Sequence, residues 1–113
     1  MSFDWGAVAS RIRGLIRLDK DSDLGAIAAR LGVSEHSLKM SVDARAPLPT
    51  IDVIAALVRV YGLDPSWVLT GQYDHATHRV ALESDTKEIA AEMRHLIDDV
   101  SRGIRPELRR RIP

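Results

Sequence analysis

The first regular pattern along the chain is a stripe of apolar residues at helical spacing between residues 4 and 18. Val8, Ile12 and the pair Leu15 and Ile16 recur every three to four positions, which is the period of one helix face. Asp4, or Ser2 before it, can cap the start of this helix. The run DKDSD that follows is polar and ends the pattern.

Two short helices separated by a glycine are predicted next. Asp23 can cap a helix over residues 24–31, and Gly32 follows where a left-handed residue normally ends a helix. Ser34 can then cap a third helix that runs to about Ser41, with Leu38 as its main buried residue.

A strongly apolar helix and a short capped helix complete the first part of the chain. Pro49-Thr50 opens the fourth helix, IDVIAALVRVY, which Gly62 closes. Asp64-Pro65 then supplies an N-cap and a proline in the first turn of a fifth helix. We expect Trp67 of this helix to lie in the core.

The last third of the chain is predicted to be a linker, a helix and a basic tail. Residues 73–84 are assigned as the linker, and the alternation of His78, Val80 and Leu82 is compatible with a short strand. The helix spans residues 85–103, begins at Ser84 or Asp85 with a capping box, and precedes a tail over 104–113. Its apolar positions have the spacing of a short coiled coil or of a docking helix; they are Ile89, Met93, Leu96 and Val100. We therefore predict an all-α protein with a five-helix domain over residues 1–72 and a C-terminal helix.

Composition excludes several classes of protein. The chain has 113 residues, 45% hydrophobic and 28% charged, as in ordinary globular proteins. It has no cysteine, no signal-peptide pattern and no apolar run long enough to cross a membrane. These features predict a cytoplasmic protein without disulfides or thiolate metal sites.

Charge is balanced overall but unevenly distributed. The formal net charge is zero, with 16 basic and 16 acidic residues. Residues 73–100 are acidic and residues 101–113 are rich in arginine. A neutral chain argues against strong non-specific binding to nucleic acid, although a local basic face is compatible with it.

The segment Asp23 to Ser41 carries the main indication of function. A helix held at a steep angle to its neighbour by a glycine turn, with its outer face exposed, can enter the major groove of DNA. The alternative is an ordinary corner between two helices, because Ala, Gly and Leu at these spacings occur in many helical proteins.

The wider pattern resembles a known family. The stretches LGAIAARLGVSEHSL and PTIDVIAALVRVYGLDPSWVLTG are similar to the Cro/cI-type (Xre, lambda-repressor-like) helix-turn-helix family, over about residues 8–72. The resemblance implies a sequence-specific regulator that binds double-stranded DNA, normally a repressor, and no catalysis. It also implies that the DNA-binding residues are Ser34, Glu35, His36, Ser37, Lys39, Arg45 and Thr50, with Arg11 or Arg13 approaching phosphate.

Physical reasons accompany these assignments. Lys39 can donate to guanine, His36 can donate or accept, and Glu35 can accept from the N4 amino group of cytosine. Arg45 supplies the positive charge that phosphate contact requires.

Two departures from the family pattern, together with the neutral net charge, support a rival hypothesis. Leu24 replaces a glutamine that commonly braces the DNA contacts, and Glu35 brings negative charge to the reading helix. A further departure is at Ile16 and Val42, where the family has an ion pair between the first and third helices. Because both partners are apolar here, neither leaves a buried charge without its partner. The rival is a degenerate helix-turn-helix that binds protein and antagonises another regulator.

Other chemistry has little support in the sequence. Asp74, His75 and His78 contain metal-binding groups, but such residues in a polar segment are more often solvated. No nucleophile motif or phosphate-binding glycine loop is present, so we expect no metal, no cofactor and no enzyme activity. A single domain covers only a short half-site, and we expect a homodimer joined by Ile89, Met93, Leu96 and Val100.

Overall fold

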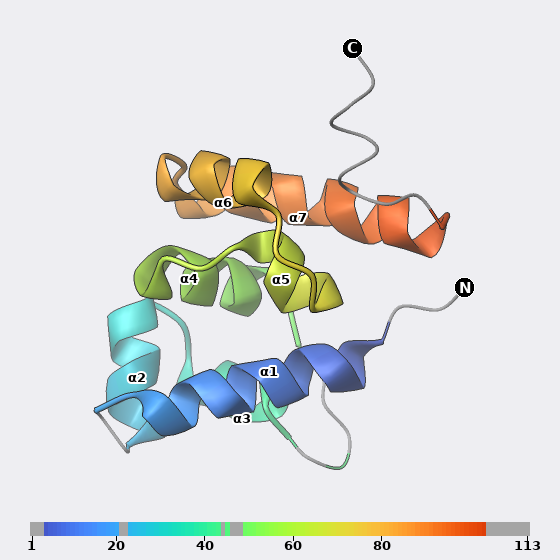
Figure 1. Cartoon of the computed structure of the whole chain (residues 1–113). Coiled ribbons are helices and arrows are strands. Elements are labelled where there is room, and N and C mark those ends of the chain that lie inside the picture. Colours follow the sequence, from blue (N-terminus) through green and yellow to red (C-terminus); the bar gives the residue numbers. More distant parts are fainter. Residues whose placement is uncertain (1–3, 21–22, 44, 46–48, 104–113) are drawn as a thin grey trace.

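The fold is built from helices alone. The computed structural model describes residues 4–20, 23–43, 45 and 49–103, and within these ranges it contains no strand (Figure 1). The predicted all-α class is therefore confirmed. The helices are α1 (Trp5–Leu18), α2 (Leu24–Leu31), α3 (Glu35–Ser41), α4 (Ile51–Tyr61), α5 (Pro65–Thr70), α6 (His75–Leu82) and α7 (Thr86–Ser101).

Side-chain caps fix the starts of the helices. The side chain of each N-cap residue accepts a hydrogen bond from a backbone N–H of the first turn, which would otherwise lack a partner. At α7 the cap is a full capping box formed by Asp85 and Glu88. The caps, in chain order, are Asp4, Asp23, Ser34, Thr50, Asp64, Asp74 and Asp85.

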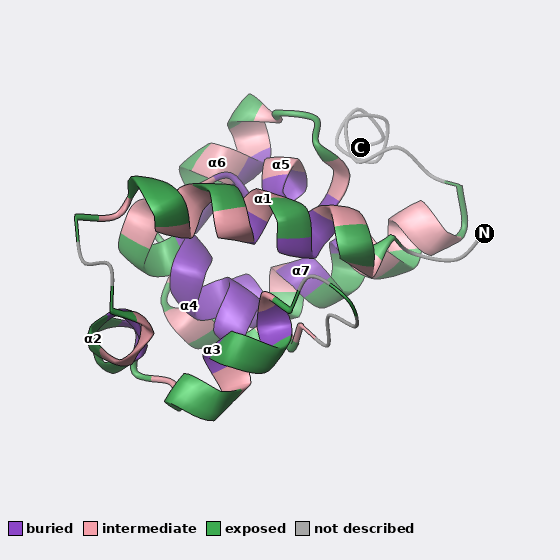
Figure 2. Cartoon of the chain, turned by 90° about the horizontal axis from the view of Figure 1, so that it is seen from below, coloured by how far each residue is buried: buried purple, intermediate pink, exposed green. Residues whose placement is uncertain are grey.

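Helix α4 forms the centre of the core. Six consecutive residues of α4, Val53–Val58, are buried, because neighbouring helices cover it on several sides. Helix α7 lies along α4 and also contacts α5, whereas α2 and α3 pack on another part of α4 (Figures 1 and 2). A helix that is apolar all round is expected at such a position.

The apolar stripe of α7 is buried inside the chain, so the prediction that it joins two copies is wrong for this structure. Ile89 is 1% exposed, and Met93 and Leu96 are fully buried. Val100 is half-buried near the end of the helix. The stripe has the spacing of a coiled-coil seam, but its partner is α4 of the same chain. The docking alternative for this helix is the one observed.

Residues 73–84 contain a helix, and the prediction of a linker with a short strand is wrong. Helix α6 spans His75–Leu82, and Asp74 caps it. Its buried residues, Thr77 and Ala81, are four positions apart, which is a helical period. The more apolar Val80 and Leu82, which suggested a strand, are 45% and 62% exposed. In α6 the buried side chains are therefore a small one and a hydroxyl-bearing one, whereas the large apolar side chains are exposed.

Asp64 fastens α6 to α5. Its carboxylate is buried and accepts hydrogen bonds from Ser66 N at 3.0 Å and Trp67 N at 3.2 Å. It also accepts from Asp74 N at 2.7 Å and from Thr77 Oγ1 at 2.6 Å. One side chain thus caps α5 and holds the first turn of α6.

Trp67 lies at the edge of the core and not inside it. The residue is half-buried, whereas its neighbours Val68 and Leu69 are 1% and 4% exposed. The indole instead lines a shallow surface pocket with Leu63, Tyr73 and His78. None of the helices in the described part of the chain is long and apolar enough to span a membrane.

Candidate nucleic-acid interface

The turn between α2 and α3 sets how α3 is presented. Gly32 has a φ of 74°, in the left-handed region that favours glycine. Val33 N then donates to Ala28 O at 3.0 Å. Leu38 is fully buried against the core, so the opposite face of α3 points outward. Figure 2 shows this exposed face on the side of the molecule seen from below.

The predicted reading residues lie on the exposed part of α3. Glu35, His36 and Lys39 are exposed, as are Ser34 before the helix and Met40 near its end. The hydroxyl of Ser34 accepts from Ser37 N at 3.0 Å and lies 2.8 Å from Ser37 Oγ. The two serines are therefore engaged mainly with each other.

Glu35 and Lys39 form an ion pair across one turn of α3. Glu35 Oε1 lies 3.4 Å from Lys39 Nζ, and the two side chains are 49% and 60% exposed. The other carboxylate oxygen of Glu35 lies near the start of α2, 3.5 Å from where a Cβ on Gly25 would be. The carboxylate of Asp23 is also there, accepting from Gly25 N at 2.9 Å. Negative charge thus gathers at the first turn of α2.

Arg45 and Thr50 flank α3 in the sequence and are both exposed. The backbone N–H of Arg45 donates to Asp43 Oδ1 at 2.8 Å. The hydroxyl of Thr50 accepts from Val53 N at 3.3 Å and so caps α4. For contact with a DNA phosphate, Thr50 could therefore donate its hydroxyl proton, whereas Arg45 could supply a full positive charge.

The two arginines of α1 make contacts within the chain. Arg11 Nη1 donates to Val68 O at 3.0 Å, at the end of α5. Arg13 Nη1 donates to Val42 O at 3.2 Å and to Asp43 O at 3.4 Å. If either arginine is to contact phosphate, as expected from the sequence, that contact must compete with these hydrogen bonds. Their visible role is to tie α1 to the ends of α5 and α3.

The apolar residues at positions that depart from the family pattern are half-buried, whereas Glu35 is exposed. Ile16, Leu24 and Val42 all pack against the hydrophobic core. Apolar residues at these positions add to the core between α1, α2 and α3, as expected when an ion pair is replaced by packed side chains.

Two of the three residues considered as metal ligands, Asp74 and His78, have other contacts: Asp74 Oδ1 accepts from Ala76 N at 3.0 Å. His78 Nε2 lies 2.9 Å from Gly62 O. Because a carbonyl only accepts, Nε2 carries the proton and Nδ1 accepts from Tyr73 OH at 2.7 Å. In the described ranges no group of three or more His, Cys, Asp or Glu side chains could hold a metal ion.

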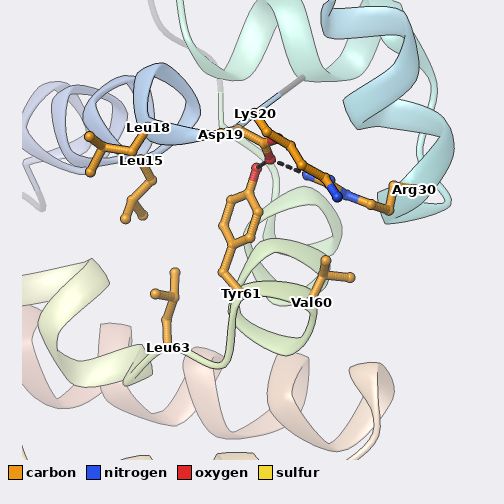
Figure 3. Close-up of a pocket in the computed structure, with 8 residues that line it drawn as sticks. All are labelled: Leu15, Leu18, Asp19, Lys20, Arg30, Val60, Tyr61 and Leu63. Atoms are coloured by element: carbon orange, nitrogen blue, oxygen red, sulfur yellow. Dashed lines mark hydrogen bonds and ion pairs between the residues drawn. The ribbon is translucent and has the colours of Figure 1, made fainter. Parts of the chain in front are cut away.

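A groove of about 550 Å³ between α1, α2 and the end of α4 is a feature that the sequence did not indicate (Figure 3). Its apolar side consists of Leu15, Leu18, Val60 and Leu63, and its polar end holds Asp19, Lys20, Arg30 and Tyr61. The sequence held one sign of it that the analysis of periodicity did not use: Leu18 and Val60 are apolar but lie off the buried stripes of their helices.

Asp19 is the centre of the polar end of this groove. Its side chain is 4% exposed and forms an ion pair with Arg30. Tyr61 OH donates to Asp19 Oδ2 at 2.6 Å, and the Arg30 guanidinium lies 5.8 Å from the Tyr61 ring centroid. Burial, together with the hydrogen bond to Asp19, raises the pKa of Tyr61 to about 12. The three side chains join the ends of α1 and α4 to α2.

Comparisons with models of protein families, with curated proteins and with solved structures found no match to the chain.

Proposed function

We propose that the chain is a sequence-specific double-stranded DNA-binding protein with a lambda-repressor-like helix-turn-helix, acting as a transcriptional repressor in the cytoplasm. The observation that supports this most is the exposed outer face of α3, anchored through Leu38 and preceded by the Gly32 turn. A short helix held in this way has the form required to enter the major groove.

The roles proposed for individual residues follow from their chemistry. Lys39 donates to guanine, and Glu35 accepts from cytosine N4 once DNA separates their ion pair. Arg45 contacts phosphate without reading sequence. Because Lys39 and Glu35 neutralise each other in the free protein, we expect weak binding to unrelated DNA.

The proposal is tested by enriching a random duplex library on the full-length chain and then titrating the enriched sequence at two salt concentrations. Arg45→Ala should weaken binding to all sequences and lower the salt slope by about one unit. Lys39→Ala should relax the preference at one base pair, at a cost of about 1–3 kcal/mol for the enriched site.

Arg79→Ala is the matched control for these variants. Arg79 is an exposed arginine on α6, on the opposite side of the molecule from α3 (Figure 1). Its replacement should leave affinity, base preference and salt slope unchanged. Failure of the wild-type chain to enrich any sequence would refute the proposal.

A second candidate function, a protein-interaction module that antagonises another regulator, is favoured by one observation. The carboxylates of Glu35 and Asp23 lie at the start of α2, where a phosphate would be repelled. Glu35→Gln distinguishes the two functions. It should change base preference in a DNA-binding protein, and it should create no specific DNA binding in a protein-interaction module.

A further inference from the structure

Aromatic rings gather in the surface pocket beside α5 and α6, which the proposed function does not use. Trp67, Tyr73 and His78 line this pocket together with Leu63, and its volume is about 390 Å³. The chain has one Phe, two Trp and two Tyr residues, and two of these residues meet here. Tyr73 is 59% exposed and Trp67 is half-buried. The volume lies at the small end of the range for small-molecule sites.

Hydrogen bonds hold two of these rings in fixed positions. Tyr73 OH donates to His78 Nδ1 at 2.7 Å, and His78 Nε2 lies 2.9 Å from Gly62 O and donates to it. The centroids of the two rings are 5.4 Å apart and their planes meet at 79°, so the rings stand like two walls of a corner. His78 is uncharged in this arrangement, because its Nδ1 accepts. A wall that is fixed before a ligand arrives lowers the entropic cost of binding.

The polar groups of the pocket wall are already engaged within the chain. The two ring nitrogens of His78, the hydroxyl of Tyr73 and the carbonyl of Gly62 bond to one another. The carboxylate of Asp64 also lines the pocket, but it accepts four hydrogen bonds and caps α5, where the helix dipole offsets its charge. A ligand that depends on directional hydrogen bonds therefore finds few partners here.

The chemistry of the wall favours one class of ligand. Among the described residues no Lys or Arg lines the pocket, so an anion would have no opposite charge to pair with. A methylated ammonium ion needs no hydrogen bond, and its positive charge is attracted to the faces of aromatic rings. An uncharged group of the same shape would gain hydrophobic contact alone. Ring faces whose neighbouring polar groups are engaged therefore suit a methylated ammonium ion best.

We propose that this pocket binds a small quaternary ammonium compound of about the size of choline. Its methyl groups lie against the rings of Trp67, Tyr73 and His78, with Leu63 as the aliphatic part of the wall. Helix α6, which carries His78, lies on the opposite side of the molecule from α3 (Figure 1). The inference therefore does not rest on DNA binding, and either proposal can fail without the other.

Tryptophan fluorescence of the full-length Trp5→Phe chain tests this proposal, because Trp67 is then its one tryptophan. Choline chloride is titrated in parallel with sodium chloride at equal ionic strength. Choline should change the emission saturably, with a Kd of about 1 mM or below, and sodium chloride should not. The uncharged analogue of choline, in which a tert-butyl group replaces the trimethylammonium group, should bind about ten-fold more weakly.

Replacement of Tyr73 in the same background separates the ring face from the hydrogen bond. Tyr73→Leu should weaken choline binding several-fold, whereas Tyr73→Phe keeps the ring and should retain most of the affinity. His75→Leu is the matched control, because His75 is an exposed residue of α6 outside the pocket, and should bind choline like its parent. Circular dichroism should show that these variants remain folded.

Three results would each overturn the proposal. The first is the absence of a saturable change at about 20 mM choline. The second is equal binding of choline and its uncharged analogue, which would show that the charge plays no part. The third is unchanged affinity in Tyr73→Leu, which would place the ligand elsewhere on the chain.

Discussion

At the scale of single residues, Asp64 receives more donors than capping a helix requires. Two backbone N–H groups of α5, one of the α6 boundary and the hydroxyl of Thr77 all donate to its carboxylate. Because the carboxylate is 4% exposed, water cannot readily replace it if it is removed.

We therefore predict that Asp64→Ala lowers the free energy of unfolding by about 2–4 kcal/mol. The loss combines an N-cap, about 1 kcal/mol, with buried donors left unsatisfied, about 1–3 kcal/mol. Asp4→Ala is the control, because Asp4 is an exposed N-cap with a single acceptor bond to Ala7 N, and should cost about 1 kcal/mol. Chemical denaturation measures the free energy of unfolding of both variants. Equal losses for Asp64→Ala and Asp4→Ala would contradict the role of Asp64 in holding α6 to α5.

Tyr61 makes stability depend on alkaline pH. Its pKa is about 12 in the folded chain and about 10 in an unfolded chain. A raised pKa means that the folded state holds the phenol proton more tightly, so this contribution is complete below pH 10 and is lost as pH rises toward 12. Because solvent screens a half-buried group, the loss should be below about 2 kcal/mol.

The test compares wild-type and Tyr61→Phe chains by chemical denaturation at increasing pH. Between about pH 8 and pH 11 the wild-type chain should lose more stability than the variant, and the difference should grow with pH. Tyr73→Phe, which changes an exposed tyrosine, should behave like the wild type. Parallel pH curves for wild type and Tyr61→Phe would show that the phenol has an ordinary pKa.

Which single residues could be read from the sequence depended on the range of their interactions. The caps at Asp23, Ser34 and Asp64 were predictable because a cap acts on residues two or three positions ahead. The bond from Tyr61 to Asp19 spans 42 positions and has no local pattern. Trp67 was expected in the core because it follows a capped turn and precedes the apolar Val68 and Leu69, although the edge of a small domain also accepts an indole.

At the scale of helices, periodicity predicted type and bounds well and partners poorly. The helices at Leu24–Leu31 and Ile51–Tyr61 lie where the pattern placed them. Helix α6 was missed because its buried positions are Thr77 and Ala81, which add almost no hydrophobic signal. The stripe on α7 was recognised, but a stripe looks the same whether its partner is α4 or a second chain.

For the candidate site, the sequence likewise predicted which positions of α3 are exposed but not how α3 lies against α2. The exposed positions of α3 followed from Leu38 as the buried residue. The ion pair of Glu35 with Lys39 has the ordinary helical spacing of four. The approach of Glu35 to Gly25 depends on the angle between α2 and α3, which residue spacing does not give.

At the scale of the whole molecule, the fold does not divide at Gln72. Helix α7 covers α4 and α5, and it supplies the fully buried side chains of Met93 and Leu96. The first 72 residues therefore do not include all the side chains that bury their apolar residues.

We predict that a chain ending at Gln72 does not unfold cooperatively on heating, because the removal of α7 uncovers apolar residues of α4 such as Leu57 and Val58. Thermal melts followed by circular dichroism measure this. The control is a chain ending at Gly103, which keeps every described helix and should melt like the full-length chain. A cooperative melt of the shorter chain near the wild-type temperature would show that α7 is dispensable.

The dependence of α4 on α7 also has a consequence for how the protein is made. Roughly 35 residues separate the end of α4 from Leu96, and ribosomes add about 5–20 residues per second. For about 2–7 s during each round of synthesis, the most apolar helix of the chain is complete while the segment that covers it has yet to be translated. Over that interval the nascent chain is a natural substrate for a chaperone that binds short apolar segments, and codons that slow translation between α4 and α7 would lengthen its exposure.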